Sequence, residues 1–437
     1  MTPRASALVF LAALLLRLGY LGLVYAGPDS LRHPDTEGYE VVAAWLAGEL
    51  PEAERPTQLL ALRTPGYPAY LALFRATLGS DLLWPVLGQA FLDSLSCVLI
   101  AWLAASLAPR LGLLAGLLAA ANLNLITSSA LALSETCFLL PLVVSLLAGV
   151  RFMARPGAGW AALAGLALGL SLLVRPVFQA FPPLLAVTLL IAARARGVAW
   201  GRALLYASLA MLTLAGVVTP RLVGNAREFG YVSLSSAAGP HLMRWTLPQA
   251  RRWSQSVPAE QGQAEAMLRL QRQLAEQGLD APPANPFEAS AQQAELARRA
   301  LWEIGVPGLV KAWALSTPVL LAAPSLVAVP QIAGLERPLY LRWLLLGALV
   351  TATLRLLQLA GLARIGRPDG LPWGPTLFLL GFAAYSLVVG GPYAKTVIRY
   401  RIAVEPLLVI LLAAGIQWAA AALKTRRASA VGPRSAG

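Results

Sequence analysis

Long apolar runs constrain this chain more than any other feature of its sequence. A membrane-spanning helix needs about 20 predominantly apolar residues. Runs of this kind recur at about 5–26, 82–107, 111–131, 136–153, 159–175, 177–193, 202–220, 307–328, 338–360, 372–390 and 402–422. Only 13% of the 437 residues are charged, whereas soluble domains carry about 25%. The sequence therefore predicts an all-α polytopic membrane protein with about 10–11 membrane helices.

The net charge of +14 does not require a nucleic-acid partner, because the cations lie mainly in short gaps between the apolar runs. Arginines recur in alternate gaps of the first half, at Arg110, Arg151, Arg155, Arg194, Arg196 and Arg202. The positive-inside rule places those gaps in the cytoplasm. The N-terminus is then inside, as a retained first span, and the segments 27–81 and 221–306 lie outside. The prevalence of Arg, Ala, Gly and Leu is typical of a GC-rich bacterial genome.

The topology of the C-terminal half has two interpretations. If every run spans, the Arg-rich tail 423–437 lies outside, against its charge. If 307–328, which contains three prolines, stays on the outer face or re-enters, ten spans remain and the tail is cytoplasmic. This ten-span interpretation is preferred, and it places 391–401 outside.

We expect one transmembrane domain, 1–437, with interfacial helices in 27–81 and further helices in 221–306. The stretches "PAEQGQAEAMLRLQRQLAEQG" and "NPFEASAQQAELARRALWEIG" are rich in helix-forming residues, and Ser290 is a candidate cap for the second. Cys97 and Cys137 form no metal-ligand pattern and no disulfide framework. Nothing in the sequence demands a metal or other cofactor, and a divalent ion stays possible. His33 and His241 have no metal-like partners and are expected at the interface.

Acidic residues concentrate directly after the first run, in "RHPDTEGYE". The following residues predict an amphipathic helix with Tyr39, Val42, Ala43 and Leu46 on one stripe. Such a helix lies in the membrane interface, its apolar face in the headgroup zone. Asp35 at its start is then held at a fixed height, as suits a base acting on a membrane-anchored substrate. The alternative is an ordinary solvated loop carboxylate.

A rigid turn follows in "RTPGYPAYLALF", where Arg63 precedes Pro65 and Gly66. Tyr67 is an aromatic residue of the interface type. Arg63 is either an interfacial arginine at a membrane-entry corner or a clamp for a lipid phosphate, whose oxygens match the guanidinium fork.

Glu135 lies in a very short outer turn between two runs, in "ALSETCF". A carboxylate so close to the membrane interior costs free energy of desolvation, which makes Glu135 a candidate functional residue. The alternative is that Ser134 and Glu135 begin the next helix, whose positive dipole end favours an acid.

Cations also gather before the last run, in "KTVIRYRIAVEP". With ten spans they face outward, which suggests an anionic ligand such as a lipid phosphate; if every run spans they are cytoplasmic anchors. Arg17 and Asp93 fall inside two spans and are expected to form a buried structural pair.

These motifs, in this order, resemble those of the GT-C superfamily of polyprenyl-phosphate-sugar-dependent glycosyltransferases. The nearest branch contains the protein O-mannosyltransferases and the lipid A aminoarabinose transferases. The likeness covers nearly the whole chain: the acid and tyrosine of the first outer loop, "RTPGYP" for the family's "RPPGYP", a second-span glutamine, "SET", "GLALGLSLLVRP" and "RYRIAVEPLLVILLAAG". In "TPRLVGNAREFG" the family arginine is replaced by Gly224, and Arg221 lies three residues before it.

The resemblance implies inverting transfer of a sugar from a polyprenyl-phosphate donor, with Asp35 as general base. Glu37 and Glu135 are further catalytic candidates. The candidate substrate-binding residues are Tyr39, Arg63, Tyr67, Gln89, Arg221, Asn225, His241, Lys395, Arg399, Tyr400 and Arg401. The acceptor is a glycolipid, a polysaccharide or a protein, and the expected place is the outer face of a bacterial inner membrane.

Two other classes stay open. A transporter or flippase of lipid-linked or anionic substrates predicts inverted repeats and broken helices that meet at the bilayer midplane. No such symmetry is visible, and the polar residues cluster on one side. A structural membrane subunit would need no acids in its outer turns.

Overall fold

The computed structural model describes residues 1–323, 337–392 and 398–430, and this part of the chain contains helices and no strand. Eight of its helices are long and apolar enough to cross a membrane, or up to nine if a pair bent by 51° counts as one span. The protein is therefore an integral membrane protein, as predicted. The long helices are α1 (Pro3–Val24), α5 (Leu83–Leu107), α8 (Glu135–Ala154), α11 (Trp200–Phe229), α15 (Pro286–Ala322), α17 (Arg337–Leu362), α18 (Trp373–Gly390) and α19 (Glu405–Ala430).

Three predicted runs form shorter or bent helices. The run 111–131 becomes the bent pair α6 (Gly112–Ala120) and α7 (Leu123–Ser129). The runs that follow α8 become α9 (Ala158–Val174) and α10 (Pro182–Ala195), with 17 and 14 residues. Small residues let these helices approach closely, as is common in membrane bundles. A Cβ on Gly165 of α9 would lie 1.9 Å from the carbonyl oxygen of Ala210 in α11.

The predicted pair of Arg17 and Asp93 is confirmed inside the bundle, between α1 and α5. The Nε of Arg17 lies 2.5 Å from Oδ2 of Asp93, and both side chains are fully buried. The same guanidinium donates to the carbonyl oxygens of Ala13 and Ala120 and to the sulfur of Cys97. A charge kept from solvent requires such partners, so this cluster fastens α1 to its neighbours.

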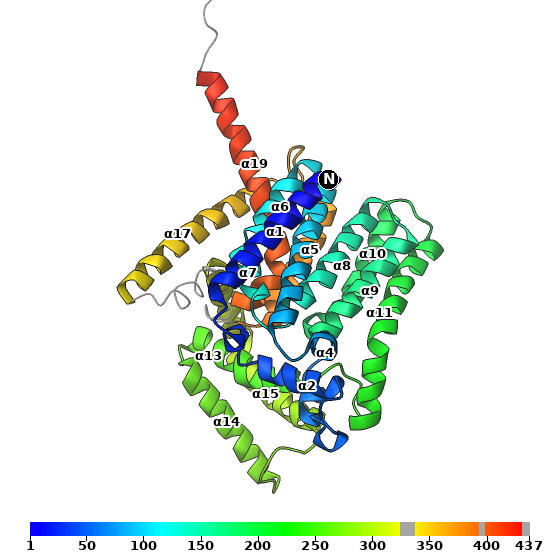
Figure 1. The fold of residues 1–437 in the computed structure, drawn as a ribbon, viewed down its shortest axis with the longest axis vertical. Helices are drawn as coiled ribbons and strands as arrows, with labels where there is room; N and C mark the ends of the chain where they lie inside the picture. The colour runs from blue at the N-terminus through cyan, green and yellow to red at the C-terminus, as the bar shows by residue number, and fades with distance from the viewer. Residues whose placement is uncertain (324–336, 393–397, 431–437) are drawn as a thin grey trace, which may run out of the picture.

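The bundle has two ends with different content (Figure 1). The N-terminal end holds Met1, which lies close to Gly112, and Arg110, whose carbonyl oxygen accepts from Gln417 of α19. The far end holds α2 (Thr36–Leu46), α4 (Gly66–Leu78), α13 (Leu247–Gln255) and α14 (Ala259–Glu276). In the chain, α3 (Thr57–Leu62) lies between α2 and α4, and α12 (Ala238–His241) leads toward α13. The two segments predicted to lie outside, 27–81 and 221–306, meet at this end. Arg55 of the first forms an ion pair with Glu228 of the second.

Helix α15 is broken at Gly305, where φ is 75°, and the end of its second part, 306–322, contacts α17, because the Leu321 carbonyl oxygen accepts from Arg355 at 2.7 Å. Lys311 donates to the Ser254 carbonyl oxygen, and Trp313 donates to that of Val388. Arg401 donates to the carbonyl oxygens of Leu320, Leu321 and Ala323. Although this helix is apolar enough to span, its contacts agree with the ten-span interpretation.

Two details of the predicted outer helices differ from the structure. The apolar stripe of α2 does not face lipid, because Tyr39 and Ala43 pack on Tyr67 and Leu71 of α4. The helix that begins at Pro286 is capped by Asn285, whose side chain accepts from the amide of Phe287. Ser290 lies inside that helix and accepts from the amide of Gly239. In both cases the side chain contacts a segment that is distant in the sequence, so the local sequence pattern does not reveal the contact.

Candidate active site

Asp35 stands directly before α2 at the far end of the bundle, and two guanidiniums hold its carboxylate. Nη2 of Arg63 lies 3.2 Å from Oδ1, and Nη2 of Arg399 lies 2.6 Å from Oδ2. The side chain of Asp35 is 30% exposed, so the protein covers it only in part. Arg399 belongs to the short helix η7 (Ile398–Val404), which precedes α19.

Arg63 is fixed from several sides. Its guanidinium stacks 4.4 Å from the ring centroid of Tyr39, and Nη1 lies 3.3 Å from the Tyr39 hydroxyl. Its backbone carbonyl accepts from Arg221, which also donates to the carbonyl oxygens of Leu60 and Leu234. Arg221 therefore supports the turn that carries Arg63 and does not itself face Asp35.

Glu135 forms a second centre beside the first. It begins α8 with only 1% of its side chain exposed, and its Oε1 lies 2.6 Å from Nη1 of Arg175 at the end of α9. Arg399 lies between the two carboxylates, because its Nε is 3.8 Å from the same Oε1. Ser134 connects the centres again, since its hydroxyl lies 3.3 Å from that of Tyr39 and accepts from Arg175 at 3.4 Å.

Tyr400 adds an aromatic side to the group. Its ring centroid is 5.6 Å from the guanidinium of Arg399 and 5.9 Å from that of Arg175. The ring of His241 lies 6.3 Å from the ring of Tyr400. Segments from five distant parts of the chain thus meet here: 33–39, Arg63, 134–135, Arg175 and 399–400.

The electrostatics of the group favour an ionised Asp35. Burial raises the pKa of this carboxyl, but Arg399 and then Arg63 outweigh burial and hold the pKa below its ordinary value of 3.8. His33, whose Nδ1 lies 3.7 Å from Asp35, has a lowered pKa, because burial and Arg399 outweigh the two carboxylates. His33 is therefore neutral at pH 7.

Tyr67 and Gln89, both fully buried, support the walls of the site. The Tyr67 hydroxyl donates to Oε1 of Gln89 at 2.8 Å, and Nε2 of Gln89 donates to the carbonyl oxygen of Leu131 at 2.6 Å. The hydroxyl of Thr64 donates to the carbonyl oxygen of Val174 at 2.8 Å. These bonds tie the turn at 63–67 to the loop before Glu135 and to the residue before Arg175.

Several predicted residues are not brought to Asp35. Arg401 is 2% exposed and pairs with the buried Glu405 at 2.6 Å, besides binding the end of 306–322. Glu405 is in turn bound by the amides of Asn122 and Asn124. Asn225 donates to the Ser233 carbonyl oxygen at 2.5 Å. Glu37 is exposed and no described residue forms an ion pair with it; Lys395 lies outside the described residues.

Arg175 is the residue that the sequence analysis missed, although it stands in the "LVRP" end of the fifth run. The signal was available: with the first-half topology, an arginine at this end of α9 is an outward cation, against the positive-inside trend. Ser134 gave no such signal, because a serine before a helix is an ordinary cap residue.

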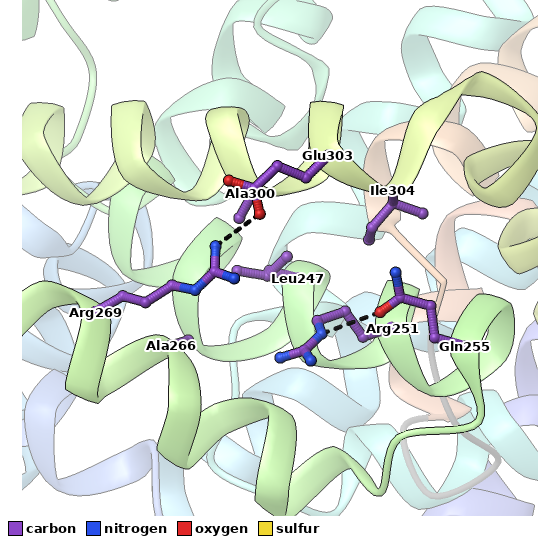
Figure 2. A pocket seen from close by; sticks show the side chains of 8 residues that line it. All are labelled: Leu247, Arg251, Gln255, Ala266, Arg269, Ala300, Glu303 and Ile304. Atoms are coloured by element: carbon purple, nitrogen blue, oxygen red, sulfur yellow. Dashed lines mark hydrogen bonds and ion pairs between the residues drawn. The ribbon is translucent and has the colours of Figure 1, made fainter.

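Two cavities in the described residues lie away from Asp35. One, of about 130 Å³, lies between α13, α14 and the first part of α15 (Figure 2). It is lined by Leu247, Arg251, Gln255, Ala266, Arg269, Ala300, Glu303 and Ile304. Its arginines are already paired, Arg269 with Glu303 at 2.8 Å and Arg251 with Glu265 at 2.5 Å. Across the described ranges, no group of three His, Cys, Asp or Glu residues could hold a metal ion.

Comparison with known proteins gave matches among solved structures alone. No family model matches the chain, and no curated protein matches it. The chain is similar to the Archaeoglobus fulgidus oligosaccharyltransferase in its apo form, with 15% identity, a TM-score of 0.48, and coverage of 99% of this chain and 52% of the other. The chain thus spans about half the length of that protein.

Two further similar structures are of ArnT from Cupriavidus metallidurans. The apo structure has 14% identity and a TM-score of 0.42, and the match covers 94% of this chain and 76% of the other. The structure bound to undecaprenyl phosphate has 15% identity and a TM-score of 0.41, with coverage of 96% and 79%. At this identity the likeness concerns the course of the chain and not its chemistry.

Proposed function

We propose that the protein is a membrane glycosyltransferase that moves a sugar from a polyprenyl-phosphate donor to an extracytoplasmic acceptor, with inversion. The observation that carries the proposal is the convergence of Asp35 with three arginines, Arg63, Arg175 and Arg399, at one end of a membrane bundle. A reaction between a lipid-anchored donor and an acceptor in water takes place at the membrane surface. It needs a general base for the acceptor and cations for the donor phosphate there. The motif resemblance to GT-C enzymes supports the same reaction.

In this proposal Asp35 acts as general base. It is ionised, since its pKa is held low, and its partial exposure leaves room for an acceptor hydroxyl. The carboxylate takes the hydroxyl proton while the acceptor oxygen attacks the anomeric carbon from the face opposite the phosphate. Positioned proton transfer of this kind accelerates a reaction by about 10²–10⁴.

The arginines would bind the donor phosphate and stabilise it as it leaves. Guanidiniums suit this work because their planar donors match two phosphate oxygens at once. All three side chains are partly buried and are held by protein partners before the donor binds, so they favour developing charge more strongly than water does. Tyr39 and Tyr400 support these guanidiniums through their ring faces.

The test is transfer by the purified protein from a labelled polyprenyl-phosphate sugar to a mixture of envelope acceptors, read as release of free lipid phosphate. Asp35→Asn should abolish release, because the amide cannot accept the proton. Asp29→Asn is the matched control: Asp29 lies in the same loop, its side chain is 99% exposed, and transfer should be unchanged.

Thermal unfolding in detergent should show both variants folded. Unchanged transfer by Asp35→Asn would remove this residue from the reaction. A protein that moves the donor across vesicle membranes without releasing lipid phosphate would be a transporter, and the glycosyltransferase proposal would be wrong.

A further inference from the structure

Among the residues that the structure describes, the charged groups at the site leave one positive charge uncompensated. Arg63, Arg175 and Arg399 supply three guanidiniums, and Asp35 and Glu135 supply two carboxylates. His33, whose Nδ1 lies 3.7 Å from Asp35, is neutral at pH 7. A donor phosphodiester carries one negative charge, so the free site and the donor are matched in charge.

The three guanidiniums differ in how firmly the protein holds them. Arg63 is stacked on Tyr39 and bonded to its hydroxyl, and Arg175 is bound to the buried Glu135 and to Ser134. Arg399 contacts Asp35 closely at 2.6 Å but reaches Glu135 only at 3.8 Å. Its closest polar contact is therefore with Asp35, while the charge of the more distant Glu135 also attracts it.

We infer that Arg399 passes from Asp35 to the leaving phosphate as Asp35 takes the acceptor proton, an inference that rests on the proposed function. The acceptor O–H bond and the bond between the anomeric carbon and the phosphate oxygen break. A bond forms between the anomeric carbon and the acceptor oxygen, and the proton moves to Asp35. The electron pair of the broken glycosyl bond stays on the phosphate.

The charge balance is kept throughout this step. Protonation of Asp35 raises the net charge of the protein groups at the site from +1 to +2. The phosphate changes at the same time from a diester monoanion to a monoester dianion. A phosphate monoester loses its second proton with a pKa of about 6, so the product is dianionic at pH 8. Arg399 is the guanidinium free to follow the charge, because Asp35 is its close partner and loses that charge.

The test measures binding of undecaprenyl phosphate in detergent at pH 8 to the full-length protein and its variants. Asp35→Asn imitates the protonated acid, and it should bind the lipid phosphate about 10-fold to 100-fold more tightly than the wild type, the range expected for one freed charge-assisted hydrogen bond. In an Arg399→Gln background the same Asp35→Asn change should bring no gain. In an Arg63→Gln background the gain should persist.

Equal affinity of wild type and Asp35→Asn, or a gain that survives Arg399→Gln, would overturn the inference and leave the proposed function standing. Absence of binding to folded wild-type protein would overturn the proposed function itself.

Discussion

Arg175 illustrates how a single residue acquires its role from its surroundings. In the sequence it is one arginine before a proline at the end of an apolar run. In the structure it neutralises Glu135, whose side chain is 1% exposed, and contacts Ser134. A carboxylate so deeply buried is stable only beside a cation, because desolvation of an isolated charge costs several kcal/mol. Arg175 and Glu135 are therefore best understood as a pair.

The pH dependence of transfer should reflect the low pKa of Asp35. The base works when ionised, and its pKa lies below 3.8, so kcat/KM should stay nearly constant between about pH 8 and pH 5. Arg399→Gln removes the partner that lowers this pKa most, so the acid limb of the residual activity should move to higher pH. Initial rates of transfer measured from pH 4 to pH 8 for both proteins check these two statements. If the acid limb of Arg399→Gln lies at the same pH as that of the wild type, the prediction is wrong.

The same ion pairs contribute to stability with a defined sign. A carboxyl whose folded pKa is depressed stabilises the fold above its unfolded pKa, and the contribution disappears as the pH falls through the folded value. For Asp35 this loss belongs to the region below pH 3.8. The free energy of unfolding should therefore not change with pH near neutrality on account of Asp35.

At the scale of elements, the site depends on how closely α4 approaches the end of α9. A Cβ on Gly66, the first residue of α4, would lie 2.7 Å from the carbonyl oxygen of Leu173. The turn with Arg63 is thereby set against Arg175, and the bond from Thr64 to Val174 fixes the same contact. Glycine is used here because only a residue without Cβ permits this backbone distance.

Gly66→Ala should reduce the free energy of unfolding by about 1–3 kcal/mol, since the backbone must move to relieve the overlap. Transfer should fall as well, because the turn moves Arg63 relative to Asp35. Gly159→Ala is the control: this glycine lies in α9 with no atom within 4 Å of an added Cβ. Thermal unfolding and the transfer assay measure both variants, and equal behaviour of the two would show that the close contact is unimportant.

At the scale of the molecule, the chain separates a bundle of long helices from a far end that carries α2, α13 and α14 (Figure 1), and Asp35, directly before α2, meets Arg63 and Arg399 there. The contact between Arg110 and Gln417 places the second half of α19 beside the N-terminal end. Helix 306–322 has contacts with Ser254 and Val388 at the far end and a further contact with Arg355 of α17. Both termini of the bundle therefore belong to one side of the membrane in this arrangement.

Single cysteines should reveal this sidedness in cells. In a background with Cys97→Ala and Cys137→Ala, Glu54→Cys should react with an impermeant maleimide from outside, whereas Thr2→Cys and Lys424→Cys should react only after permeabilisation. All three positions are exposed, so access depends on the membrane alone. Labelling of Lys424→Cys in intact cells would favour the interpretation in which every apolar run spans.

The sequence by itself determined that this is a polytopic α-helical membrane protein. The length of the apolar runs and the placement of arginines between them are local properties that govern insertion into a bilayer. It also indicated Asp35, Arg63, Glu135 and Arg399, since isolated charges beside apolar runs are conspicuous. Tertiary structure decided which of these charges meet. Arg401 and Arg399 are two residues apart, yet one binds buried carbonyl oxygens and the other binds Asp35. Such pairing depends on which distant segment lies opposite each side chain, and no local pattern contains that information.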